Sequence, residues 1–173
     1  MIFYKSILIL LFYFFFVIHV NAFTDNDGDG AKSTGREDLS FLKAQNSDFK
    51  KGKDAFKQGI KYEKKNKIKK ANDRFEKALK YFVSANERSS NDVEILYYLG
   101  FVYNKVGDLM MSEIYYKEGL NNDPKNSLIN KELGELYFNT NRVNLAKKRL
   151  KVLSSCDCKE FSELKKIIAR EKN

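Results

Sequence analysis

The sequence predicts an all-α fold, and three observations support this prediction. The chain contains one Pro and no Trp in 173 residues, and its Lys, Glu, Leu and Asn content favours helices over a turn-rich β architecture. From Ser47 onward, apolar residues recur at the spacing of one helix face. A short pattern then returns after 34 residues. The length is sufficient for one domain with a sizeable core.

The first 22 residues are expected to be a secretory signal peptide. One positive charge precedes an unbroken apolar run from Ile7 to Ile18, and small side chains follow at "VNA", which ends at Ala22. This is the layout of a cleaved export signal. We expect a mature N-terminus at Phe23 and a periplasmic or secreted protein. An uncleaved N-terminal membrane anchor is the alternative, although the run is shorter than the ~20 residues of a membrane span.

Residues 23–46 are expected to form a flexible polar linker, because their first part has too few apolar side chains to order itself. Asp25, Asp27 and Asp29 match the opening of a calcium-binding loop. The twelfth position of that loop is Arg36, where a bidentate Glu would be needed. No metal site is therefore predicted.

The repeat is visible as Leu-Gly-x-x-Tyr at Leu99 and again at Leu133. It resembles the tetratricopeptide repeat, TPR, whose 34-residue signature joins a Leu-Gly-x-x-Tyr helix to a second helix with a small and an aromatic position. The second repeat contains Leu96, Leu99, Gly100, Tyr103, Ser112, Tyr116 and Pro124, and the third contains Leu133, Gly134, Tyr137, Ala146 and Leu150.

A more degenerate first repeat precedes these two. It contains Ala55, Gly59, Tyr62, Ala71, Phe75 and Ala78. Gly59 precedes Gly100 by 41 residues, which is 34 plus 7. Seven residues are two helical turns, so we expect a longer second helix in this repeat. The resemblance implies a TPR α-solenoid over residues 47–155, built from three helical hairpins at about 52–92, 93–126 and 127–155.

Residues 156–173 are expected to contain a Cys pair and a capping helix. Glu160, Phe161, Leu164 and Ile168 follow the pair, and this ending resembles a group of small exported TPR proteins of α-proteobacteria. Those relatives usually space the cysteines by three residues, whereas here Asp157 alone separates Cys156 and Cys158. Because exported thiols are kept paired, we expect a disulfide. An Asp157–Glu160 capping box is expected at the helix start.

The sequence argues against an enzyme. The single His is His19, within the expected signal peptide, so the remaining chain lacks an imidazole for base catalysis or zinc binding. No Gly-rich phosphate loop follows a strand. No cofactor is predicted, and the favoured function is a scaffold in the cell envelope that binds an unidentified protein or peptide.

In the TPR family the first helix of each hairpin lines a concave groove. Carried over to this sequence, the resemblance implies partner binding by Phe56, Ile60, Tyr97, Phe101, Asn104, Lys131, Glu135 and Phe138. The aromatic and aliphatic members would lie side by side on an exposed surface and hold an extended or helical partner segment. The alternative occupants are a terminal segment of this chain, for example through Phe41 and Leu42, or a second copy.

Charge supports a second hypothesis. Between Lys50 and Lys80 there are thirteen Lys or Arg and four Asp or Glu, a local net charge of +9. An exported basic surface meets anionic lipid headgroups or envelope polymers more readily than nucleic acid. The alternative function is therefore binding of an anionic envelope surface or polymer by the first repeat. A Lys-rich face that is merely solvated is the simpler explanation.

Overall fold

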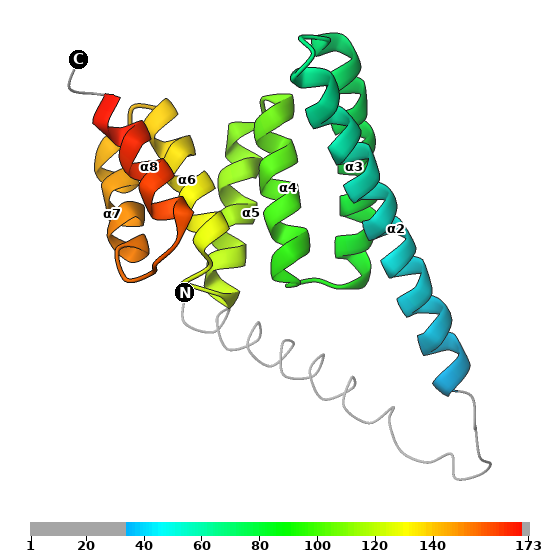
Figure 1. Ribbon diagram of the computed structural model, residues 1–173. Coiled ribbons are helices and arrows are strands. Elements are labelled where there is room, and N and C mark those ends of the chain that lie inside the picture. Colours follow the sequence, from blue (N-terminus) through cyan, green and yellow to red (C-terminus); the bar gives the residue numbers. More distant parts are fainter. Residues whose placement is uncertain (1–33, 171–173) are drawn as a thin grey trace, which may run out of the picture. The chain divides into compact units, whose positions relative to one another are not determined.

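The computed structural model describes residues 34–170, and seven α-helices and no strand lie in this part of the chain (Figure 1). The expected signal peptide and its cleavage site lie outside the described residues. The helices are α2 (Thr34–Glu63), α3 (Ile68–Arg88), α4 (Val93–Val106), α5 (Leu109–Asn122), α6 (Ser127–Asn139), α7 (Val143–Leu153) and α8 (Lys159–Ala169). Consecutive helices pair as the first hairpin (α2–α3), the second (α4–α5) and the third (α6–α7), and α8 packs on α6 and α7. The predicted all-α TPR solenoid is confirmed.

The expected flexible linker is wrong in its second part, because α2 begins at Thr34 and has 30 residues. The segment from Arg36 to Ala44 contains no Gly or Pro and several good helix formers. It therefore continues the helix of the first repeat toward the N-terminus. Residues 23–33 lie outside the described part.

The turn inside each hairpin uses the same backbone conformation at the same repeat position. Asn66, Gly107 and Asn141 all have positive φ, at 53°, 92° and 59°. Gly and Asn tolerate this left-handed conformation better than other residues, which explains why the chain can turn at these positions. Asp92 and Asp108 then cap α4 and α5 by accepting hydrogen bonds from backbone N–H groups of their first turns.

Glycines allow the two helices of a hairpin to approach closely. A Cβ added at Gly100 would lie 2.5 Å from the Tyr116 ring, and one at Gly59 would lie 2.6 Å from the Phe75 ring. The first hairpin repeats this contact two turns away, where Gly52 faces Phe82 at 2.6 Å. The expected longer second helix is present, since α3 has 21 residues and α5 has 14.

The third hairpin uses its glycine differently. A Cβ at Gly134 would lie 2.5 Å from Leu164 of α8, so this position serves the capping helix. Leu164 is fully buried in a core cluster that joins α5, α6, α7 and α8. The expected Asp157–Glu160 capping box is not formed, because the N-cap is Cys158 and makes no side-chain cap hydrogen bond.

Candidate partner-binding site

The predicted groove residues lie on the first helices of the three hairpins. Phe56 and Ile60 belong to α2, Tyr97, Phe101 and Asn104 to α4, and Lys131, Glu135 and Phe138 to α6. Contacts between these helices bring the residues to one side, which we call the inner face. Phe56 of α2 packs on Phe101 of α4, and α4 also contacts α6.

Three aromatic members of the inner face, Phe56, Tyr97 and Phe101, form one cluster. The ring centroids of Phe56 and Phe101 are 5.2 Å apart in an edge-on arrangement, and those of Tyr97 and Phe101 are 6.1 Å apart. The predicted juxtaposition is therefore found, but the predicted exposure is not. Each of these side chains is only half-exposed and packs against a core cluster. The rings consequently join α2 to α4 as well as facing outward.

The cluster includes two side chains that the repeat register did not predict there, Phe49 and Tyr98. The Tyr98 ring stacks on Phe82 at 5.0 Å and lies 5.8 Å from Phe49 and 5.3 Å from Phe56. The apolar residues of α4 cover more than one face of that helix, from Ile95 to Val102. This wide apolar surface predicts that both Tyr97 and Tyr98 contact other helices.

Two lysines border the aromatic cluster. Lys53 lies over the rings of Phe49 and Tyr98, and its Nζ donates to Oε1 of Glu94 at 2.8 Å. The hydrogen bond to Glu94 raises the pKa of Lys53. Lys105 lies over the Phe101 ring and pairs with Glu63 of α2 at 2.8 Å. Both lysines therefore carry their charge against aromatic faces, a favourable cation–π arrangement.

Carboxylates dominate the other half of the inner face. Lys131 Nζ pairs with Glu132 at 2.9 Å and with Glu135 at 3.4 Å. Burial alone would lower the pKa of Lys131, but these carboxylates outweigh burial and raise it. Burial raises the pKa of Glu132, and Glu160 is also buried. Lys131 and Glu135, two of the predicted binding residues, form an ion pair with each other, so they leave little unsatisfied charge for a partner.

Asn104 has the features of a free recognition group. Its side chain is half-exposed and makes no hydrogen bond with other residues in the part of the chain that the structure describes. An amide can donate to and accept from the backbone of an extended peptide. It lies one turn beyond Phe101 on the same helix, so a partner that covers the ring would reach the amide.

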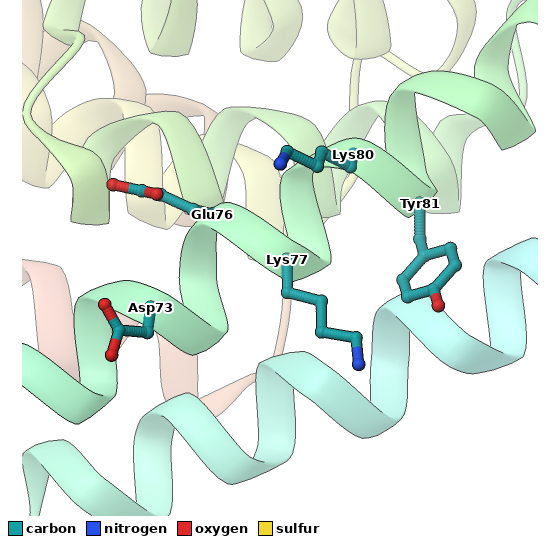
Figure 2. Close-up of a pocket in the computed structure, with 5 residues that line it drawn as sticks. All are labelled: Asp73, Glu76, Lys77, Lys80 and Tyr81. Carbon is teal, nitrogen blue, oxygen red and sulfur yellow. The ribbon is translucent and has the colours of Figure 1, made fainter.

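One surface hollow lies outside the inner face. Asp73, Glu76, Lys77, Lys80 and Tyr81 line a surface hollow of about 450 Å³, and all five belong to α3 (Figure 2). Lys51 of α2 lies over the Tyr81 ring at its side, 5.7 Å from the centroid. Because α3 is the second helix of its hairpin, this hollow is not part of the inner face. Its lining carries both acidic and basic side chains, which do not favour any one class of ligand.

The part of the chain covering residues 34–170 shows no group of three or more His, Cys, Asp or Glu that could hold a metal ion. Nor does any helix there combine the length and the apolar character needed to span a bilayer. The predicted disulfide partners Cys156 and Cys158 are paired between α7 and α8, with Cα atoms 5.3 Å apart. Oxidation of the pair in the isolated protein stays a prediction.

Proteins similar to this chain are found among solved structures. No family model and no curated protein matches the sequence. Among solved structures, the C-terminal TPR-containing domain of an FK506-binding protein of Plasmodium falciparum is 19% identical with a TM-score of 0.47. The match covers 73% of this chain and 91% of that domain. The helical hairpins and their 34-residue register define a TPR-like fold.

Proposed function

We propose that this protein is a non-enzymatic scaffold of the cell envelope, acting in the periplasm or outside the cell, whose inner face binds a segment of a partner protein. The supporting observation is the half-exposed aromatic cluster of Phe56, Tyr97 and Phe101 beside the unpaired amide of Asn104. The rings supply apolar anchors, and the amide supplies a contact for the partner backbone.

The structure determines how this proposal must be tested. Replacing Tyr97 and Phe101 with Ala would remove contacts between α2 and α4, so lost binding would not be separable from lost stability. Asn104→Arg instead adds a bulky cation to the inner face without removing a described contact. Asn144→Arg is the matched control, because Asn144 is exposed on α7, the second helix of its hairpin.

The experiment has two stages. A photo-crosslinking side chain introduced at Asn104 or at Asn144 is activated in the native cell envelope, and the captured protein is identified and purified. Asn104→Arg should then weaken binding of that protein at least about tenfold, the scale of one interface hot spot. Asn144→Arg should leave the affinity unchanged. Equal affinities for the two variants, or capture from Asn144 alone, would reject the inner face as the binding site.

A second candidate function is binding of an anionic envelope surface or polymer by the first hairpin. It is supported by the lysines Lys57, Lys61, Lys64, Lys65, Lys67, Lys69, Lys70, Lys77 and Lys80, which are all exposed. None of them forms an ion pair within residues 34–170. Salt separates the two functions, since attraction to a polyanion collapses at high ionic strength, whereas apolar anchoring survives it.

A further inference from the structure

The antiparallel pairing places the turn of every hairpin at one end of the helices, which is the upper end in Figure 1. Large apolar side chains are exposed at this end. Ile68, directly after the first turn, is 52% exposed, and Leu109 and Met110, directly after the second, are 41% and 70% exposed. Isolated exposed apolar residues are ordinary. Here Ile68 and Leu109 occupy equivalent repeat positions in neighbouring hairpins, so the exposed apolar side chains lie at the same end of both hairpins.

The first of these turns also concentrates positive charge. The segment from Lys64 to Lys70, which we call the first tip, reads Lys-Lys-Asn-Lys-Ile-Lys-Lys. Its five lysines are exposed and none forms an ion pair within the described residues. The nearest carboxylate in sequence, that of Glu63, is already engaged by Lys105 at 2.8 Å. Charge at the first tip is therefore uncompensated, and one exposed Ile lies among the five cations.

We infer that the first tip docks onto the surface of an anionic phospholipid bilayer, with its lysines at the headgroups and Ile68 inserted between them. This inference rests on the second candidate function and specifies its ligand and its contact residues. A soluble polyanion would attract the lysines alone, whereas an anionic bilayer would attract the lysines and also bury the apolar side chain. Basic residues near an anionic leaflet each contribute attraction, and inserted apolar area adds to it.

The second turn fits as a weaker contact on the same surface. Leu109 and Met110 offer apolar area there, but Asp108 precedes them and caps α5. Because no lysine cluster accompanies this turn, the first tip supplies the electrostatic attraction. The inner face is formed by the sides of α2, α4 and α6, so docking at their ends leaves it open to a partner segment.

The absence of Trp from the chain permits a local test. Ile68→Trp introduces a single indole at the first tip. With the full chain and vesicles of phosphatidylglycerol and phosphatidylcholine in equal parts, its emission should move to shorter wavelength as the ring leaves water. With phosphatidylcholine alone it should not move. Leu128→Trp is the matched control, because Leu128 is 42% exposed at the start of α6, where the opposite ends of the helices lie. An equal shift for both variants, or no shift for Ile68→Trp, would overturn the inference.

Charge reversal tests the lysines independently. The triple variant Lys65→Glu, Lys67→Glu and Lys69→Glu should weaken binding to the anionic vesicles about 100-fold, because each basic residue contributes roughly 1 kcal/mol at such a surface. Exposed side chains at a turn and a helix start tolerate Glu, and unchanged thermal melting would verify the fold.

A matched triple variant controls for net charge. Lys148→Glu, Lys151→Glu and Lys166→Glu remove the same charge from exposed positions on α7 and α8. This variant should retain most of the vesicle affinity, and an equal loss in both triple variants would overturn the assignment to the first tip.

Polyphosphate separates the failure of this inference from the failure of the function on which it rests. Binding of polyphosphate that depends on Lys65, Lys67 and Lys69, without any vesicle binding, would keep the second candidate function and overturn bilayer docking. If the unmodified chain bound neither polyphosphate nor vesicles, the second candidate function and bilayer docking would both be overturned. Vesicle binding that depends on the first tip, together with the Trp shift, supports both.

Discussion

The first and second hairpins share a glycine–aromatic contact and a turn residue with positive φ, but they differ in helix length, capping and surface charge. In each, a glycine of the first helix lies against an aromatic ring of the second, Gly59 with Phe75 and Gly100 with Tyr116. The first hairpin has a 21-residue second helix that begins at an uncapped Lys67. The second has a 14-residue helix capped by Asp108. The repeat therefore constrains the helix interface and leaves length, capping and surface charge free to change.

The two additional turns of the first hairpin follow the same rule. Gly52 lies seven residues before Gly59, and Phe82 lies seven residues after Phe75. Because two turns restore nearly the same face of a helix, the glycine–aromatic contact is duplicated along the same interface. The seven additional residues therefore lengthen the interface between α2 and α3 and do not form a loop.

Phe82→Ala gives the largest expected effect and tests whether the duplicated contact is real. Phe82 is fully buried, and Tyr98 and Phe49 pack on its ring. Its truncation should lower the free energy of unfolding by about 3–5 kcal/mol in urea denaturation. Phe75→Ala should lower it equally. A loss below about 1 kcal/mol for Phe82→Ala alone would mean that the extension of the first hairpin frays in solution.

Gly100→Ala should have the next largest effect. The added Cβ would lie 2.5 Å from the ring of Tyr116, which is fully buried and cannot rotate away. We expect a loss of about 2 kcal/mol, despite the better helix propensity of Ala. Gly119→Ala is the control, because its Cβ would meet mainly the Cδ1 end of the Ile129 side chain. If both substitutions were neutral, close approach at Gly100 would not stabilise the second hairpin.

The helices and their register followed from the sequence because Gly, aromatic and turn residues return at fixed intervals. Asn66, Gly107 and Asn141 occupy one turn position and share one backbone conformation. The start of α2 did not follow, since propensity beyond the repeat gives no periodic signal for residues 34–46. The inner face was predicted as a set of exposed anchors. Its burial depends on cross-helix contacts such as Phe49 with Tyr98, which the repeat register does not encode.

The junctions between hairpins differ as the hairpins do, and pH should reveal it. Between the second and third, Glu113 of α5 accepts from Arg142 at 2.5 Å and from Tyr137 at 3.2 Å, and it pairs with Lys117 at 2.6 Å. Burial alone would raise the pKa of Glu113, but the two cations outweigh burial and lower it. Between the first and second, Glu63 pairs with Lys105, and the side chain of Glu63 is 37% exposed, compared with 17% for Glu113.

Glu113→Gln should therefore lower the free energy of unfolding at neutral pH by about 2 kcal/mol, because Arg142 and Lys117 lose the negative charge with which they pair. A depressed pKa in the folded state stabilises the fold above the unfolded value of about 4.3, and this contribution disappears as pH falls through the folded pKa. The difference between the unmodified chain and the variant should accordingly shrink below about pH 4 in unfolding experiments across pH. Glu63→Gln should cost less than Glu113→Gln, and the reverse order would contradict this comparison of junctions.

The smallest effect is expected at the end of the chain opposite the first hairpin. Thiol titration of the isolated protein should find no free sulfhydryl, because Cys156 is paired with Cys158. The pair closes a loop with only Asp157 between its cysteines, so it restricts the unfolded chain little.

The helix α8 is held instead by Leu164 and Ile168, which are buried against the third hairpin. Reduction, or Cys156→Ser, should thus lower the free energy of unfolding by about 1 kcal/mol or less. Leu164→Ala should lower it by at least about 2 kcal/mol, because it removes a fully buried side chain. If reduction released α8 as completely as Leu164→Ala does, as judged by hydrogen exchange of its amides, the capping helix would depend on the disulfide rather than on its apolar face.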